Sequence, residues 1–407
     1  MNHLILGAGA AGISAARTIL KEKLDDTVVM VSEDREVYSR CMLHRFISGE
    51  RDAESLNFVN DGLLKNSRFR WIGGKTITRL DGAAKTVYAG DEKVASGDTV
   101  LIATGANSVS PPIGELRTAK NAFGLRHLSD ARSITECAKK AEKIAVIGAG
   151  LVGLDAAYAL LELGKKLSIV EMAETVLAIN LDAHAALAYQ RRFEEKGAAF
   201  YLGRKVVNTR SDGAGGITAL ELDSGTVVPC DMVIVAVGVR PATGFLAESG
   251  VKAERAVAVD DRLATNIPGI YAAGDVAGLS GIWPNAVKQG EVAGENMCGV
   301  DYVYEDRFAA KNTVNFFGLL SLSVGAVNPQ EGDTVLIRED RFNYKKLILR
   351  DGAPAGLILQ GNIAGSGFWQ HLVKNKIRID NRGKSPWKIS YADFFGVENN
   401  GEYKWVV

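Results

Sequence analysis

A glycine-rich segment near the N-terminus carries the clearest chemical signal in the sequence. Gly7, Gly9 and Gly12 stand at the GxGxxG spacing. The first glycine allows a tight turn, the second lets the backbone approach a pyrophosphate, and the third lets a helix pack close to the preceding strand. Free N–H groups and the dipole at a helix N-terminus favour an anion. The segment therefore predicts a dinucleotide-binding turn.

The residues around this turn predict the elements that must position it. An apolar run at residues 3–6 predicts a buried strand, and the Ala- and Leu-rich residues 13–20 predict a helix. A second apolar strand at residues 28–31 is followed by Glu33. An acid about 20 residues after such a turn accepts hydrogen bonds from a ribose. Strand, turn, helix, strand and acid together make the pattern specific.

The same arrangement occurs a second time along the chain. A strand at 144–147, a helix at 154–163 and a strand at 167–170 enclose the glycines Gly148, Gly150 and Gly153. Glu171 follows the last strand, where a carboxylate binds a ribose 2′-hydroxyl and repels a 2′-phosphate. We therefore expect NADH rather than NADPH at this turn. Two such sites predict one tightly held and one exchanging dinucleotide.

Composition limits the remaining possibilities. With 407 residues the chain is long enough for two or three domains. Lysine plus arginine and aspartate plus glutamate both number 48, a balance that argues against nucleic-acid binding. No apolar run approaches the roughly 20 residues of a membrane-spanning helix, and no secretory signal is seen, so we expect no membrane span and a cytoplasmic location. The four cysteines and five histidines are scattered, which argues against a metal site.

Three further segments extend the pattern. Residues 99–106 read as a strand followed by Ala-Thr-Gly, residues 233–241 as a strand ending in Gly-Val-Arg-Pro, and residues 270–275 as a strand ending in Gly-Asp. With the two glycine turns, these segments resemble the flavin-dependent pyridine nucleotide–disulfide oxidoreductase superfamily. The resemblance implies FAD at the first turn and NADH at the second, where Gly238 would also contact the NAD.

A finer resemblance is to the NADH:rubredoxin and ferredoxin reductases and to the flavin portion of nitrite reductases. It rests on residues 38–43, 125–130 and 283–290. It implies an NADH oxidoreductase whose reduced flavin passes electrons to a small iron–sulfur or rubredoxin-type carrier, as a monomer or homodimer. The residues that it places at the FAD are Gly7, Gly9, Gly12, Glu33, Arg40, Ile77, Thr104, Gly105, Arg126, Gly274, Asp275, Trp283 and Ala286.

Cys41 departs from these reductases, which have proline at its position. Its spacing is similar to that of the redox cysteine in the single-cysteine branch, so the alternative function is an NADH-dependent disulfide or peroxide reductase that works through Cys41. In peroxidases and oxidases of that branch a histidine lies in the first glycine turn, where this chain has Ala10. A flavin-binding sensor is a third hypothesis, and the intact NAD turn argues against it.

A second departure concerns an ion pair near the flavin. The ring-hydroxylating dioxygenase ferredoxin reductases place lysine and glutamate where this chain has Arg45 and Asp155. We expect Arg45 and Asp155 to pair there and to position the nicotinamide. His44, three residues after Cys41, is a possible proton carrier or an ordinary surface histidine.

The predicted fold class is α/β, with two Rossmann-like dinucleotide-binding domains, the NAD domain being inserted into the FAD domain, plus a small C-terminal α+β domain. The expected boundaries are 1–110 and 242–305 for the FAD domain, 111–241 for the NAD domain and 306–407 for the C-terminal interface domain. In the last, strands at 334–337, 344–349 and 355–359 precede a helix.

Overall fold

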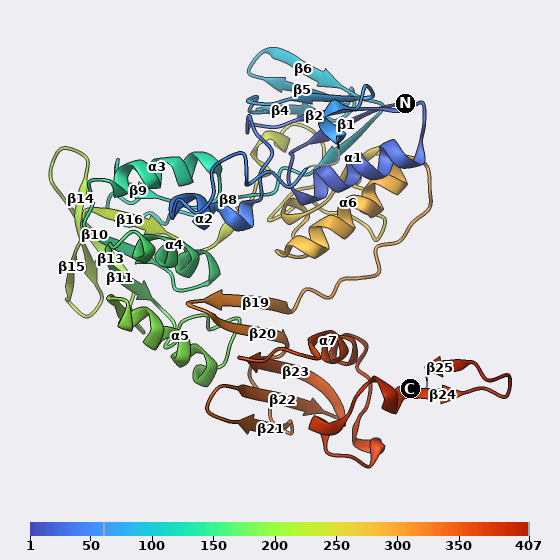
Figure 1. Cartoon of the computed structure of the whole chain (residues 1–407). Helices are drawn as coiled ribbons and strands as arrows, with labels where there is room; N and C mark the ends of the chain where they lie inside the picture. The colour runs from blue at the N-terminus through green and yellow to red at the C-terminus, as the bar shows by residue number, and fades with distance from the viewer. Residues whose placement is uncertain (60–61, 406–407) are drawn as a thin grey trace. The chain divides into compact units, whose positions relative to one another are not determined.

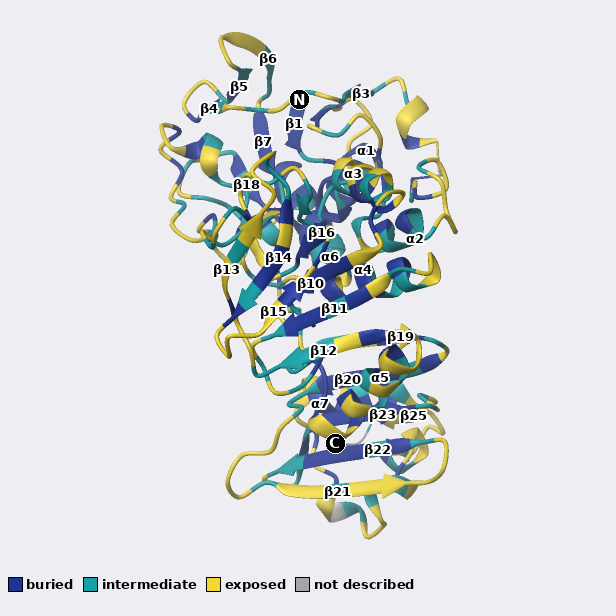
Figure 2. Cartoon of the chain, turned by 90° about the vertical axis from the view of Figure 1, so that its left-hand side faces the viewer, coloured by how far each residue is buried: buried dark blue, intermediate teal, exposed yellow. Residues whose placement is uncertain are grey.

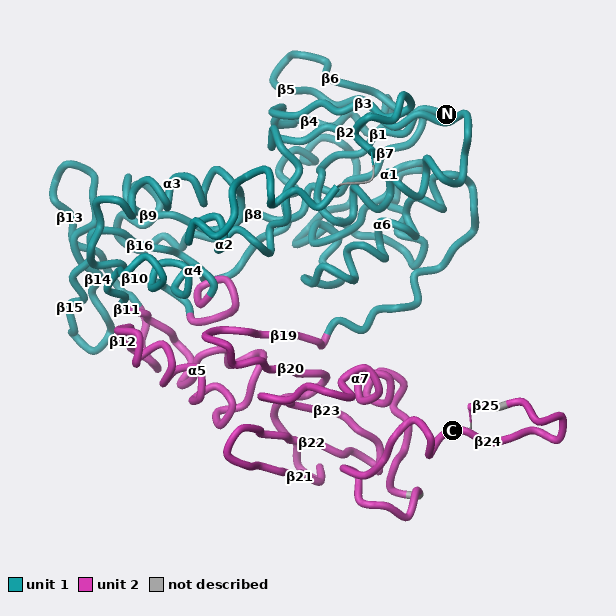
Figure 3. The backbone as a smooth tube through the Cα atoms, viewed as in Figure 1, with its two compact units in different colours: residues 1–148, 155–167, 206–309 teal, residues 149–154, 168–205, 310–407 magenta. Residues whose placement is uncertain are grey.

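The computed structural model describes residues 1–59 and 62–405. It forms two compact units, shown in different colours in Figure 3. Unit 1 comprises residues 1–148, 155–167 and 206–309, and unit 2 comprises residues 149–154, 168–205 and 310–407. In the described ranges, no helix combines the length and the apolar character needed to cross a membrane. The three domain boundaries given above stay a prediction.

A parallel sheet of five strands forms the centre of unit 1, in the order β18-β7-β1-β2-β3. Strand β1 is buried over four of its five residues and β7 over all four, as expected for a parallel sheet covered on both faces. The strands predicted at 3–6 and 28–31 are therefore confirmed. The bounds are β1 Asn2–Leu6, β2 Thr27–Val31, β3 Phe69–Ile72, β7 Thr99–Ile102 and β18 Ile270–Ala272.

Helices α1 (Ala10–Glu22) and α6 (Trp283–Met297) lie side by side against this sheet (Figure 1). Two glycines of α6 allow the contact: a Cβ on Gly290 would lie 2.1 Å from the carbonyl oxygen of Ala11, and one on Gly294 would lie 3.0 Å from that of Ala15. A side chain at Gly290 would clash with the backbone of α1, and one at Gly294 would require its neighbours to shift. The core of unit 1 continues from this contact through Ile5, Ile13 and Val292.

A second parallel set in unit 1 contains strands β10, β16 and β9 in that order. The predicted second glycine turn follows β10, and helix α4 follows the turn. The remaining bounds in this part of the chain are β9 Ala122–Phe123, β10 Lys143–Ile147, β11 Lys166–Glu171, β16 Met232–Val235, α2 Leu43–Ile47, α3 Leu128–Ala138 and α4 Leu151–Glu162.

Short antiparallel ladders complete unit 1. They are β4-β5-β6, β13-β14-β15 and the pair β8-β17. Their bounds are β4 Arg79–Asp81, β5 Thr86–Ala89, β6 Glu92–Ser96, β8 Ala106–Ser108, β13 Val206–Ser211, β14 Ile217–Leu222, β15 Val227–Pro229 and β17 Val239–Pro241.

Unit 2 contains an antiparallel sheet in the order β19-β20-β23-β22-β21. The predicted strands near 334, 344 and 355 and the helix after them are confirmed. Figure 2 shows the edge strand β21 exposed and its neighbour β22 largely buried. The bounds are β12 Ala198–Leu202, β19 Lys311–Phe316, β20 Leu319–Gly325, β21 Thr334–Glu339, β22 Tyr344–Arg350, β23 Ala353–Gln360, β24 Phe395–Val397, β25 Tyr403–Trp405, α5 Ala183–Glu195 and α7 Ser366–Asn375.

Buried polar contacts join α5 to one face of this sheet. Asp182 caps α5 by accepting from the Ala185 amide, and its other oxygen accepts from Lys346 Nζ at 2.8 Å and Tyr344 Oη at 2.7 Å. Further along the helix, Tyr189 Oη donates to Ser321 Oγ at 2.8 Å. These contacts satisfy groups that would otherwise be costly to bury.

The contact between α1 and α6 can be tested with Gly290→Ala. The added methyl meets a backbone carbonyl, so the helices must separate and we expect a loss of about 1–3 kcal/mol in the free energy of unfolding. Gly367→Ala in α7 is the matched control, because nothing lies within 4 Å of its Cβ position. Denaturant unfolding measures both, and equal stability of the two variants would contradict the packing described here.

Candidate functional site

One large cleft opens in unit 1 where the strands of the parallel sheet end. Its volume is about 330 Å³, within the roughly 300–1,000 Å³ of pockets that hold small-molecule ligands. The turn after β1, the turn after β7 and the start of α6 all contribute to its lining. Ligands of open α/β sheets bind at this position, outside the carboxyl ends of the strands.

The cleft brings together nearly all of the residues that the sequence assigned to the flavin. Gly12 is the exception, since it packs behind the turn. Cys41 also lines the cleft. The assigned residues in the lining are Gly7, Gly9, Glu33, Arg40, Ile77, Thr104, Gly105, Arg126, Gly274, Asp275, Trp283 and Ala286.

The first glycine turn has the geometry that a pyrophosphate requires. Gly7 has φ +104, and a Cβ on it would lie 2.3 Å from the Ala103 carbonyl oxygen. A Cβ on Gly12 would lie 2.0 Å from the Gly7 carbonyl oxygen. At Gly9, by contrast, nothing lies within 4 Å, and α1 begins there without a side-chain cap. Open space beside uncapped backbone amides fits a dinucleotide pyrophosphate, so the residues present fit FAD.

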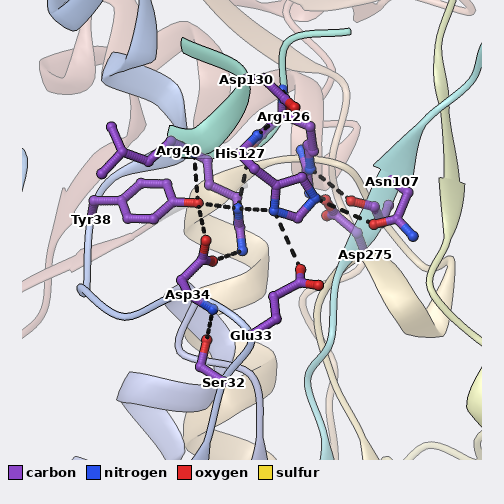
Figure 4. Close-up of polar contacts among 12 residues, drawn as sticks. Ser32, Glu33, Asp34, Tyr38, Arg40, Asn107, Arg126, His127, Asp130 and Asp275 are labelled. Atoms are coloured by element: carbon purple, nitrogen blue, oxygen red, sulfur yellow. Dashed lines mark hydrogen bonds and ion pairs between the residues drawn. The ribbon is translucent and has the colours of Figure 1, made fainter. Parts of the chain in front are cut away.

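A buried network holds Arg40 beside the cleft (Figure 4). Its guanidinium donates to Asp34 Oδ2 at 2.9 Å and to Tyr38 Oη at 2.8 Å. Tyr38 Oη in turn donates to Asp34 Oδ1 at 2.8 Å and accepts from the Leu128 amide. Burial raises the pKa of Tyr38 above its usual range, so this hydroxyl stays protonated and keeps the network intact.

His127 belongs to the same network, although it was not among the residues predicted to form the site. Its Nδ1 lies 3.3 Å from Glu33 Oε1 and 3.2 Å from Arg40 Nη1 (Figure 4). Glu33, Asp34 and His127 bring three ligand atoms within 4.8 Å of one another, but the Arg40 guanidinium beside them disfavours a metal cation. The cluster therefore orients Glu33, the residue expected to bind a ribose.

Arg126 and Asp275 face each other across the cleft wall. Arg126 Nη2 donates to Asp275 Oδ2 at 2.5 Å, and its Nε donates to the Ala106 carbonyl oxygen. Asp130 accepts from the backbone amides of Arg126 and His127, both at 2.8 Å, which fixes this segment. The capping role of Asp130 at the start of α3 is the signal that could have drawn attention to His127.

Helix α6 forms another wall. Trp283 lies in its first turn, and its ring meets Phe58 edge to face with centroids 4.8 Å apart. The buried side chain of Gln289 accepts from the Gly274 amide at 2.7 Å, so α6 fixes the turn that contains Gly274 and Asp275. Phe245 and Asn107 also line the cleft and were not predicted from the sequence.

Cys41 is exposed to the cleft and unpaired. Protein surrounds its other sides, and this partial burial, with the charge of Asp155, raises the pKa of the thiol. A raised pKa keeps the sulfur protonated, whereas the thiolate is the nucleophile and the redox-active form. The site therefore does not activate Cys41.

The prediction that Arg45 and Asp155 form an ion pair is wrong. Arg45 Nη1 pairs with Glu50 instead, and the imidazole of His44 lies beside Asp155, with Nδ1 3.8 Å from Oδ1. Burial raises the pKa of Asp155 to about 7, an effect that the charge of Arg45 opposes. Burial lowers the pKa of His44 to about 4. Near neutral pH the imidazole is therefore neutral and the carboxyl is partly protonated.

The second glycine turn is divided between the two units. In unit 1, Gly148 has φ +102, and a Cβ on it would lie 2.4 Å from the Ala236 carbonyl oxygen, while Gly238 with φ +120 faces open space. In unit 2, Gly150 has nothing within 4 Å, and Glu171 accepts from the Ala149 amide at 2.7 Å. Gly153 lies in the first turn of α4. Gly148 and Gly150 have the geometry that their positions in the motif predict, and the contacts of this turn with NADH stay a prediction.

Fold and cleft together define a flavoprotein of the two-dinucleotide class. A family model described as pyridine nucleotide-disulphide oxidoreductase matches residues 1–290, and one described as the rubredoxin NAD+ reductase C-terminal domain matches residues 311–377. The chain belongs to the pyridine nucleotide-disulphide oxidoreductase family. It is therefore an oxidoreductase with FAD and NAD(H) as cofactors, as the sequence predicted.

Individual relatives support the same assignment. The chain is similar to the nitrite reductase [NAD(P)H] of Bacillus subtilis, with 29% identity over 94% of this chain, and spans only 48% of that relative. It is 30% identical to the NADH-rubredoxin oxidoreductase of Clostridium acetobutylicum, over 93% of this chain and 96% of that one. The crystal structure of NADH:rubredoxin oxidoreductase from that organism superposes with a TM-score of 0.76 at 25% identity, covering 94% of this chain and 97% of the other.

Replacing each of two glycines of the first turn by alanine distinguishes an effect on FAD binding from an effect on helix packing. In Gly9→Ala the methyl enters the space meant for the pyrophosphate, so we expect an apoprotein of unchanged stability that binds FAD at least about tenfold more weakly. In Gly12→Ala the methyl meets backbone, so the apoprotein itself loses about 1–3 kcal/mol. Flavin fluorescence titration and thermal unfolding measure the two effects. Tight FAD binding by Gly9→Ala would contradict the placement of the pyrophosphate.

Asp155 gives a prediction for the pH dependence of stability. A carboxyl whose pKa is raised by folding destabilises the protein above its unfolded pKa, and the cost grows up to its folded pKa of about 7. The side chain is 32% exposed, so we discount for solvent screening and expect Asp155→Asn to stabilise the protein by about 1–2 kcal/mol at pH 8. The gain shrinks to about a third of that at pH 5. Denaturant unfolding at both pH values measures it, and a pH-independent difference would contradict the raised pKa.

Proposed function

We propose that the protein oxidises NADH and delivers the electrons singly to a small iron–sulfur or rubredoxin-type carrier. FAD, when bound, supplies the chemistry, because a flavin accepts a hydride and can release electrons one at a time. The chain's own residues bind and orient the cofactor, with the charged Arg126 and Asp275 and the aromatic Trp283 all in the lining of the cleft.

One observation carries the choice of acceptor. The antiparallel sheet and helix of unit 2 match the C-terminal domain model of rubredoxin NAD+ reductase over residues 311–377. The relative from Clostridium acetobutylicum, with which this chain aligns over nearly its full length, is named for the same activity. Both findings support an iron protein as the acceptor.

The protonated state of Cys41 argues against the alternative, a thiol-based disulfide or peroxide reductase. Such an enzyme needs a thiolate beside the flavin. Here burial and the Asp155 charge raise the pKa of the thiol, and Ala10 in the first turn offers no proton carrier. The alternative is not favoured.

The position of Glu171 favours NADH over NADPH as the electron donor. Its two oxygens accept from the amides of Ala149 and Ala173, at 2.7 and 2.8 Å, so the carboxylate is held at the end of β11. A fixed negative charge there repels the 2′-phosphate of NADPH. We propose a preference for NADH on this basis.

Steady-state reduction of a purified rubredoxin by the holoenzyme tests the proposal. We expect rapid NADH-dependent reduction, slower reduction with NADPH, and no turnover with low-molecular-weight disulfides or hydrogen peroxide. Cys41→Ser should retain the rubredoxin rate within about twofold, because a thiol held protonated takes no part in the transfer.

A different set of results would contradict electron transfer to an iron protein. Turnover of a disulfide or peroxide that Cys41→Ser abolishes, with no reduction of rubredoxin or of a ferredoxin, would replace the proposal by the thiol-based function. Cys230→Ser is the matched control, since that thiol is buried away from the cleft lining.

A further inference from the structure

A second cavity lies entirely within unit 2, between the antiparallel sheet and α7. Its volume is about 290 Å³, close to the lower end of the range of about 300–1,000 Å³ typical of small-molecule sites. The flavin chemistry uses none of its residues. Strand residues Arg338, Lys345 and Leu359 line one side, and Phe368, Trp369 and Trp387 line the other.

The basic side of the cavity follows from strand register. Arg338 of β21 stands directly opposite Lys345 of β22, and Lys345 stands opposite Leu359 of β23. Directly opposed residues of antiparallel strands project from the same face, with Cβ atoms about 4.5–5.5 Å apart. Two like charges in this arrangement destabilise the sheet unless an anion lies between them.

The carboxylates nearest to this cationic pair are engaged elsewhere. Glu339 projects from the opposite face and pairs with His184 at 2.9 Å. Asp340 accepts from the amides of Phe342 and Asn343, although the charge of Arg338 still helps to lower its pKa. Asp393 accepts from Ser390 and pairs with Lys384. Within residues 1–59 and 62–405, Arg338 and Lys345 have no ion pair and no side-chain hydrogen bond.

The opposite side of the cavity is aromatic. Phe368 and Trp369 are buried in the first turn of α7, and Trp387 meets Trp369 with ring centroids 5.9 Å apart. Tyr391 meets Phe368 at 4.9 Å and is 47% exposed. The parts of these aromatic rings that face the cavity favour a ligand with a flat ring over one with an aliphatic chain.

The start of α7 adds a third feature. Gly365 precedes the helix with φ +80 and offers no side-chain cap, and both it and Ala364 line the cavity. The N-terminus of α7, which carries the positive end of the helix dipole, therefore lies at the cavity and favours an anion there, as the two cationic side chains do.

We propose that this cavity binds a small aromatic anion, a planar ring that carries a carboxylate or a phosphate. The anionic group lies between Arg338 and Lys345, and the ring lies against Trp387 and Phe368. An aryl carboxylate and a nucleotide share this chemistry. The proposal is independent of the identity of the electron acceptor, because its residues belong to unit 2 and line no part of the flavin cleft.

Isothermal titration of the FAD-loaded full-length protein tests the proposal. The probes are benzoate, phenyl phosphate and adenosine monophosphate, with acetate as the anion that lacks a ring. We expect at least one aromatic probe to bind and acetate to bind at least about tenfold more weakly, because it lacks the aromatic contact. Tighter binding of benzoate identifies an aryl acid as the source, and tighter binding of the nucleotide identifies a nucleotide.

Variants locate the binding. The double variant Arg338→Gln with Lys345→Gln should weaken binding about tenfold or more, because both charge-assisted contacts are lost. Trp387→Leu should weaken it separately. Arg341→Gln is the matched control, since it removes an exposed positive charge from the same hairpin outside the cavity. All variants should keep the NADH-dependent activity of the parent, which shows that they fold.

Two results would overturn the proposal. One is the absence of binding by all three aromatic probes to the unmodified protein. The other is binding that the double variant retains in full, which would place the probe elsewhere. If the first result is accompanied by binding of polyglutamate, the face is a docking surface for an acidic protein instead.

Discussion

The close approach of α1 to its own turn and to α6 is the constraint on which the flavin site depends. Gly12 lies where a Cβ would be 2.0 Å from the Gly7 carbonyl oxygen, and Gly290 lies where one would be 2.1 Å from that of Ala11. These contacts set the start of α1 at the ends of β1 and β7. They leave Gly9 facing open space, so backbone amides rather than side chains form this wall of the cleft. The wall of the cleft made by α6 is placed by this packing.

Much of the flavin domain could be predicted from the sequence, because its signals are local. A short apolar strand, three glycines, a helix and an acid occupy consecutive positions, and each has a separate physical reason. The strands at residues 3–6, 28–31 and 144–147 and the strand series of the C-terminal sheet followed for the same reason. The cleft lining, which comes from segments far apart in the chain, could also be predicted, because the family resemblance included each of these segments.

Other features could not be predicted, since they depend on tertiary contacts. Successive residues of a helix point about 100° apart, so spacing alone does not decide whether His44 or Arg45 faces Asp155. The structure turns His44 toward it and Arg45 toward Glu50. His127 joins the Arg40 network only because the N-terminus of α3 lies beside the segment that follows β2. The cavity of unit 2 depends on the register of three strands, which sequence patterns do not fix.

The proposed electron transfer requires that the bound flavin changes oxidation state and that Cys41 does not. Anaerobic titration of the holoenzyme with NADH, followed by visible spectra, tests it most directly. The account predicts that each FAD takes up two electrons, bleaches without a long-wavelength charge-transfer band, and behaves identically in Cys41→Ser. Uptake of four electrons, or a charge-transfer band that Cys41→Ser removes, would contradict it and make the thiol part of the reaction.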